Sequence, residues 1–234
     1  MVWHAETRLL VSLFAVAALL LAFRFVVDQV MEGTTAGFDR AVVRAFGGPD
    51  AASGPAGPLW VREMARDLTS LGSFVVLGMV TLAVAGFLLL SGGRAAALLV
   101  VVAVFGGMAI NSLLKIAFAR PRPDLFVPAA KVFTASFPSG HAALSAITYL
   151  TLAALLARMT TSRRLRIYVM ALAVGLTLVI GVSRVYLGVH YPTDILAGWC
   201  IGSAWALLCW AVMTRLQQDG TVQPPRQSQG GYRM

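Results

Sequence analysis

Apolar residues along this chain gather in long, nearly uninterrupted runs. Five runs contain no charged residue, and each comes close to the roughly 20 residues that a helix needs to cross the hydrocarbon core of a bilayer. They cover 71–90, 95–114, 142–157, 167–183 and 195–214. A sixth run, 9–27, is interrupted by Arg24, and we interpret it as an uncleaved first span because no small-residue cleavage site follows it. The pattern predicts an all-α, polytopic membrane protein with six transmembrane helices in a bundle.

Two segments outside the spans carry weaker signals. Residues 60–71 alternate apolar and charged side chains, as an amphipathic helix lying on a membrane surface would, and a plain loop fits this segment nearly as well. The polar stretch 217–234 is rich in Gln, Pro and Gly and predicts a disordered cytoplasmic tail. These assignments leave 1–216 as one six-helix transmembrane domain.

Composition excludes several classes of protein. Hydrophobic residues make up 58% of the 234-residue chain and charged residues only 12%, about half of the roughly 25% found in a typical soluble domain. A soluble domain, a disordered chain and a disulfide scaffold are therefore excluded. The net charge of +9 would favour nucleic acid if it lay on a soluble face, but no basic run is interleaved with aromatic residues. We expect the bilayer, and not nucleic acid, as the partner.

The positions of the basic residues predict the orientation of the chain. The loop between the fourth and fifth spans contains four arginines and no acidic residue, which places it in the cytoplasm. Six spans then put both termini on the cytoplasmic side. Five other cations cluster at the opposite ends of the third and fifth spans, where topology gives no reason for them, so they need a chemical explanation. These cations are Lys115, Arg120, Arg122, Lys131 and Arg184.

Two clusters of candidate residues lie on that outer side, one at the end of the third span and the other at the start of the fourth. Lys115 lies on the last turn of the third span, and the prolines around Arg122 push the chain out of helix. We expect these two cations to be held near one another. At the start of the fourth span, Ser139 can cap the helix and Gly140 lets an anion approach the free backbone amides. With His141 beside it, this turn predicts an anion site that contains a histidine.

A third cluster joins the fifth and sixth spans. Ser183 and Arg184 end the fifth span, and His190 and Asp194 follow around an outer turn. The spacing of four predicts that His190 and Asp194 share one helical face and that the carboxylate orients the imidazole. Each cluster alone has an ordinary structural interpretation. Their convergence on one side of the membrane favours a functional site.

Small and polar residues continue inward from these clusters in steps of four. The steps run from Asp194 to Gly198 and Gly202, and from Lys115 to Asn111. Small residues let helices approach closely, which would bring the clusters together. Gly198 and Gly202 also form a G-x-x-x-G pair, which we assign to packing within the bundle in preference to dimerisation.

The three clusters together resemble the signature of the type 2 phosphatidic acid phosphatases, a family of membrane lipid phosphatases. That signature reads K-x6-R-P, P-S-G-H and S-R-x5-H-x3-D, and this chain matches it at every position. The six spans with outward motif loops are also similar to the membrane members of the family. The matching residues are Lys115, Arg122, Pro123, Pro138, Ser139, Gly140, His141, Ser183, Arg184, His190 and Asp194.

The resemblance implies hydrolysis of a phosphate ester or pyrophosphate through a phosphohistidine, with neither a metal nor another cofactor. His190 would be the nucleophile, Asp194 would hold its tautomer, and His141 would protonate the leaving oxygen. A second group of residues would neutralise the phosphoryl oxygens. This group comprises Lys115, Arg122, Arg184, Ser139 and the amide of Gly140.

The position of the site predicts the substrate class. A pocket at the outer end of a helix bundle meets lipid headgroups directly, so we expect a lipid phosphate. Family members of this type act on undecaprenyl pyrophosphate, phosphatidylglycerol phosphate or phosphatidic acid, among which the generic apolar spans do not distinguish. We expect a multi-pass protein of the inner (plasma) membrane with its active site facing the periplasm or the cell exterior.

Two other functions share some of these features. Vanadate-dependent haloperoxidases carry the same signature, but they are soluble and larger. A non-catalytic lipid-phosphate carrier or flippase would use the cations to hold a headgroup, yet it would not need a nucleophilic histidine and a carboxylate to orient it. Catalysis is therefore the favoured function.

Overall fold

The computed structural model describes residues 2–49, 54–128 and 134–218. Over these ranges the backbone forms eight α-helices and no strand, which confirms the all-α prediction. The helices are α1 (Val2–Met31), α2 (Ala36–Ala45), α3 (Leu59–Ser70), α4 (Phe74–Leu90), α5 (Arg94–Phe118), α6 (Gly140–Met159), α7 (Arg163–Tyr186) and α8 (Pro192–Gln218).

Six helices correspond to the six predicted spans. By length and composition, α1, α5, α6, α7 and α8 could each cross a membrane. α4 is shorter, and it reaches that standard only together with α3, from which a bend of 42° separates it. The hydroxyl of Ser73 caps the start of α4 by accepting a hydrogen bond from the backbone N–H of Val76 at 3.3 Å. The predicted helix bundle is confirmed, with α4 as its shortest member.

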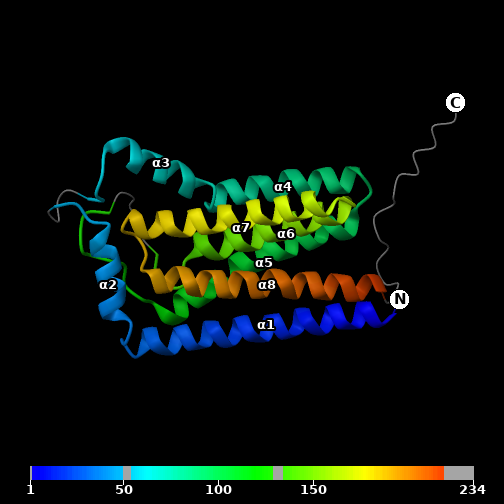
Figure 1. The fold of residues 1–234 in the computed structure, drawn as a ribbon, viewed down its shortest axis with the longest axis horizontal. Coiled ribbons are helices and arrows are strands. Elements are labelled where there is room, and N and C mark those ends of the chain that lie inside the picture. Colours follow the sequence, from blue (N-terminus) through cyan, green and yellow to red (C-terminus); the bar gives the residue numbers. More distant parts are fainter. Residues whose placement is uncertain (1, 50–53, 129–133, 219–234) are drawn as a thin grey trace.

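The bundle is built around α6. Figure 1 shows the long helices side by side, with α2 and α3 gathered at one end, which we call the site end. α6 packs against α7 and α8 most extensively and also touches α5 and α4, whereas α1 packs on α8 from outside. Half of the α6 span is buried, against 6% of the α1 span. The start of α6 is therefore held at the centre of the site end.

Between the first and second spans the structure has two short helices, of which the sequence predicted one. The amphipathic helix predicted there is present as α3, but α2 was not predicted. α2 buries Asp39 and Val43, four residues apart on one face. Ten residues with one buried valine and one buried acid leave too short an apolar stripe for the pattern to be recognised.

The end of the chain lies largely outside the described residues. α8 continues to Gln218, two residues into the predicted tail, because its helix extends past the apolar run. The remainder of that predicted tail, from 219 onward, is not part of the described ranges.

Glycines let α8 lie against α6 at backbone distance. A Cβ on Gly198 would lie 2.7 Å from the carbonyl oxygen of Ser139, and one on Gly202 only 2.4 Å from that of Ala143. A methyl group cannot enter either position unless the backbone of α6 shifts. The structure thus uses the G-x-x-x-G pair within the bundle, and the contact brings the first turns of α8 against the start of α6.

Gly202→Ala should destabilise the fold by about 1–3 kcal/mol, the usual cost of adding a methylene to a close-packed contact. Gly175→Ala on α7 is the matched control, because a Cβ there meets nothing within 4 Å. The control should be neutral or stabilising by up to about 1 kcal/mol, since alanine favours helix over glycine. Thermal unfolding in detergent measures both, and equal melting temperatures for the two variants would contradict the close contact.

Candidate active site

Two cations hold the main chain just before α6. Lys115 lies on the last turn of α5, and its Nζ donates to the carbonyl oxygen of Ala135 at 2.5 Å. Arg122 donates from Nη2 to the same oxygen at 3.2 Å, and from Nε to the carbonyl oxygen of Thr134 at 2.8 Å. The two positive charges therefore lie side by side, as the sequence predicts.

The second cluster is the turn that begins α6. The hydroxyl of Ser139 accepts a hydrogen bond from the backbone N–H of Ala142 at 3.4 Å, which makes Ser139 the N-cap residue. A Cβ on Gly140 would lie 3.0 Å from Nδ2 of Asn111 and 3.8 Å from Cε of Lys115. The start of α6 therefore lies against α5 close to Asn111 and Lys115.

The third cluster centres on Asp194, which has no solvent-exposed surface. Its Oδ2 accepts from Nδ1 of His190 at 3.3 Å and from the backbone N–H of Tyr191 at 2.9 Å. The imidazole and carboxylate do meet, but the predicted reason is wrong. α8 begins at Pro192, so His190 precedes the helix, and the turn folds it back over the first helical turn.

The partners of His190 specify its tautomer. Nε2 lies 3.2 Å from Nη1 of Arg122, and a guanidinium group has only donors, so Nε2 accepts. The carboxylate of Asp194 has only acceptors, so Nδ1 carries the proton. Burial lowers the pKa of His190 below its ordinary value, although the hydrogen bond and charge of Asp194 oppose this shift. The ring is therefore neutral at physiological pH, with a lone pair on Nε2.

Arg184 and His141 complete the set of predicted residues. Arg184 is 4% exposed on the last turn of α7, where its Nη1 donates to the hydroxyl of Thr69 at 3.4 Å. Its Nε has no hydrogen-bond partner among the described residues. The charge of Arg184 acts on both His141 and His190. All eight predicted residues thus converge at the site end of the bundle.

Two further residues contact Asp194, a third contacts one of these two, and none of the three was predicted as part of the site. Arg120 donates from Nη1 to Oδ1 of Asp194 at 2.5 Å and from Nη2 to Oδ2 of Asp39 at 2.7 Å. The hydroxyl of Ser136 donates to Oδ2 of Asp194. Arg120 had a signal in the sequence, since it was one of five unexplained cations. Ser136 and Asp39 had none, because one lies in an irregular loop and the other in a short helix remote along the chain.

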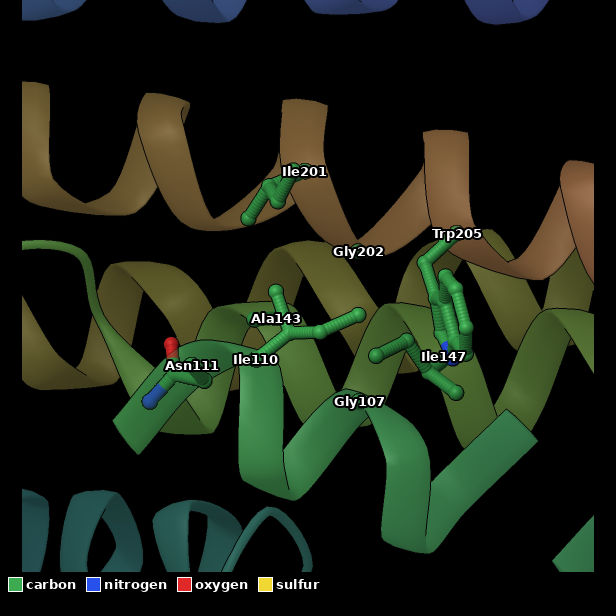
Figure 2. Close-up of a pocket in the computed structure, with 8 residues that line it drawn as sticks. All are labelled: Gly107, Ile110, Asn111, Ala143, Ile147, Ile201, Gly202 and Trp205. Carbon is green, nitrogen blue, oxygen red and sulfur yellow. The ribbon is translucent and has the colours of Figure 1, made fainter. Parts of the chain in front are cut away.

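A small cavity lies between α5, α6 and α8, farther into the bundle than the site (Figure 2). Asn111 lines it with an amide group that points away from Gly107 and Trp205. Asn111 is 1% exposed, and neither atom of its amide has a hydrogen-bond partner in the described part of the chain. The cavity is lined by Gly107, Ile110, Asn111, Ala143, Ile147, Ile201, Gly202 and Trp205.

With this geometry established, comparison with known proteins identifies the family. The chain matches the PAP2 superfamily over residues 96–218, more than half of its length, and it belongs to that superfamily. The resemblance noted from the three motifs is therefore confirmed. The matched range contains every motif residue and begins after α4, so α1, α2, α3 and α4 all lie outside it.

Individual relatives are membrane lipid phosphatases. The chain is 32% identical over 148 residues to phosphatidylglycerophosphatase B of Bacillus subtilis, which covers 61% of this chain and 70% of that protein. It is 31% identical over 182 residues to lipid A 1-phosphatase of Rhizobium etli, covering 68% and 74% respectively.

A solved structure shares the fold over nearly the whole chain. The transmembrane PAP2-type phosphatidylglycerolphosphate phosphatase from Bacillus subtilis superposes with a TM-score of 0.78 at 25% identity, over 91% of this chain and 100% of that one. The protein is therefore a multi-pass membrane protein of a family of phosphoric ester hydrolases.

Proposed function

We propose that this protein hydrolyses a lipid phosphate monoester or pyrophosphate through a phosphohistidine formed on His190. The tautomer of His190 carries the proposal, because the buried ring presents an unprotonated Nε2 while Asp194 holds Nδ1. A nucleophile of this kind needs a neutral ring, a fixed orientation and a neighbouring negative charge for the cation that it becomes. Relatives named as phosphatidylglycerophosphatase and lipid A 1-phosphatase support the same class of reaction.

The cations would hold the transferred phosphoryl group. Lys115, Arg122 and Arg184 bring three positive charges to the site, and the backbone amides at the start of α6 add the positive end of a helix. Lys115 and Arg122 donate to carbonyl oxygens of the neighbouring loop. A phosphoryl oxygen carries a full charge and is a stronger acceptor for the same N–H groups. Binding the substrate would therefore redirect these cations with little movement of the backbone.

The reaction would proceed in two displacements. Nε2 of His190 attacks phosphorus, the bond from phosphorus to the leaving oxygen breaks, and His141 gives that oxygen a proton. A monoester thus releases a lipid alcohol, and a pyrophosphate releases a lipid monophosphate. Water then attacks the phosphohistidine and gives a proton to His141, and the bond from phosphorus to Nε2 breaks to release inorganic phosphate. Asp194 stabilises the imidazolium charge that is present between the two steps.

The substrate would be a lipid because the site lies at the end of a membrane-spanning bundle. Headgroups lie at that depth, and the apolar outer faces of the helices contact the acyl or prenyl chains. Undecaprenyl pyrophosphate, phosphatidylglycerol phosphate and phosphatidic acid are the candidates. A panel assay of phosphate release from these three lipids by the purified protein distinguishes among them. A carrier or a haloperoxidase-like enzyme is not favoured, because the relatives are lipid phosphatases.

His190→Ala should lower phosphate release at least about 1,000-fold, because it removes the attacking atom. Asp194→Asn should lower it about 100-fold or more, because an amide cannot hold the same tautomer. Arg24→Gln is a control, since Arg24 lies on an exposed part of α1 and pairs with Asp28, four residues further along the same helix, at 2.9 Å. Near-normal turnover by His190→Ala in a phosphate-release assay would contradict the mechanism.

Activity should persist in EDTA and fall in orthovanadate. The proposed steps use only protein groups and water, and the described ranges contain no group of three or more His, Cys, Asp or Glu placed to bind a metal. Vanadate adopts the trigonal-bipyramidal geometry of the phosphoryl transition state, so the same cations should bind it. Assays with and without each reagent measure both effects, and loss in EDTA that Mg²⁺ restores would overturn the metal-free reaction.

We propose that the site end faces the periplasm or the cell exterior, because the arginine-rich turn between α6 and α7 lies at the opposite end. In a variant without Cys200 and Cys209, Val127→Cys should react with a membrane-impermeant thiol reagent in intact cells. Thr161→Cys should react only after lysis. Val127 is 60% exposed and Thr161 is also exposed, so both positions are accessible. The reverse order of labelling would place the site in the cytoplasm.

A further inference from the structure

Arg120 joins two buried carboxylates that come from different parts of the chain. Nη1 donates to Oδ1 of Asp194 at 2.5 Å, and Nη2 donates to Oδ2 of Asp39 at 2.7 Å. The Arg120 side chain is 13% exposed, and both carboxyl groups are fully buried. Its guanidinium also lies 4.4 Å from the centre of the Tyr191 ring. Because these three residues hold its planar guanidinium group, the Arg120 side chain has one orientation.

The contacts of Asp194 divide between its two oxygens. Oδ2 accepts from three groups, namely the hydroxyl of Ser136, the backbone N–H of Tyr191 and Nδ1 of His190. Oδ1 accepts from Arg120. A buried carboxylate oxygen without a donor is costly, so Arg120 sets the rotation of the carboxylate about its bond to Cβ. That rotation decides how Oδ2 meets the imidazole of His190.

Asp39 holds Arg120 and also binds the first turn of α8. Its Oδ1 accepts from the backbone N–H of Thr193 at 3.2 Å, and its Oδ2 accepts from the Thr193 hydroxyl at 2.7 Å. Arg120 donates to that same hydroxyl from Nη1 at 2.9 Å. Asp39 belongs to α2, which crosses the site end of the bundle in Figure 1. An element outside the matched family range therefore reaches the neighbour of Asp194.

The group formed by Asp39, Arg120 and Asp194 contains two negative charges and one positive charge. Burial opposes the charge of Arg120, but the charge of Asp194 and hydrogen bonds to both carboxylates raise its pKa, so it stays cationic. Asp39, Arg120 and Asp194 together carry one net negative charge, next to His190. Without Asp39, the guanidinium would cancel the charge of Asp194, and less would remain to stabilise an imidazolium.

We propose that Arg120 and Asp39 are positioning residues that orient and balance Asp194 for its contact with His190, and that α2 thereby belongs to the catalytic structure. The functional part of this inference rests on the proposed phosphohistidine mechanism. Neither residue touches the reacting atoms, since both act through Asp194. In the competing explanation, Arg120 and Asp39 form a structural bridge that only holds α2 against the bundle. Variants that change the charge beside His190 distinguish the two explanations.

Three variants change the charge beside His190 in opposite directions. Asp39→Asn removes one negative charge, Arg120→Gln removes one positive charge, and the double variant restores the original sum. The double variant also avoids leaving one buried charge without its partner, which is the main cost of each single change. The matched control is the exposed pair on α1, as Arg24→Gln, Asp28→Asn and their double variant. Size-exclusion profiles and melting temperatures in detergent identify any variant that does not fold.

Each single variant should lower kcat about 10- to 100-fold, the usual effect of removing an outer partner of a site residue. KM should change less, because neither residue contacts the phosphoryl group. The acid limb of kcat/KM should move to lower pH in Asp39→Asn and to higher pH in Arg120→Gln, because the pKa of His190 follows the local charge. The double variant should return the acid limb toward its original position while kcat stays low.

Several other charged groups face His190 and stay constant across the series. They are Asp194 of α8, Arg122 of the loop after α5, Arg184 of α7 and His141 of α6. Opposite displacements of the acid limb can therefore be assigned to the two altered charges. Folded variants with the original kcat, or acid limbs that move in the same direction, would overturn the proposal, as would equal effects in the α1 control pair.

A second measurement does not depend on phosphatase activity. In protein labelled with ¹⁵N-histidine, the ring nitrogen shifts at neutral pH report which nitrogen of His190 carries the proton. His190 should carry it on Nδ1 in the original protein and should show a mixture of tautomers in Arg120→Gln. Unchanged shifts in that variant would overturn the positioning role. If His190→Ala were active while the tautomer still changed, the phosphohistidine mechanism would fail and the positioning role would stand.

Discussion

Asp194 carries its negative charge at a position without solvent, and the site end of the protein is arranged around that charge. A buried carboxylate is stable only when it is paired and hydrogen-bonded. Its donors come from the loop after α5, through Arg120 and Ser136, and from the turn before α8, through Tyr191 and His190. Satisfying one carboxylate therefore fixes two loops relative to each other. Those loops carry the residues proposed to act on phosphate.

The opposite arrangement occurs where phosphate is proposed to bind, because three cations gather there without an ion pair to any acidic residue that the structure describes. Lys115 and Arg122 donate to main-chain carbonyl oxygens, and Arg184 to the hydroxyl of Thr69. Carbonyl and hydroxyl groups hold a cation in place and leave its charge uncancelled. An anion entering such a site meets charges that are already oriented, which is the arrangement that stabilises phosphoryl transfer. The site therefore has two parts. In one, the negative charge of Asp194 is paired with donors, and in the other the charges of the cations are held in place but not neutralised.

Helix packing places these two groups together. α6 lies in the middle of the bundle, and Gly198 and Gly202 let the backbone of α8 approach it closely. Gly140 likewise leaves space for the amide of Asn111 at the end of α5. Larger side chains at these positions would separate the turn at the start of α6 from Asp194. The small residues are thus as necessary to the site as the charged ones.

The sequence by itself determined the all-α bundle and that the three motifs share one end of it, because long apolar runs and helical spacing are local properties. It also determined the family and the eight candidate site residues, since each motif is a short, contiguous pattern. Their roles remain proposals. Only the tertiary structure brought Asp39 of α2 to Arg120, placed Ser136 on Asp194, and showed that His190 reaches Asp194 from a turn before the helix. These contacts join segments that share no sequence pattern, so they could not be predicted from it. They form because a buried carboxylate needs hydrogen-bond donors and a charged partner.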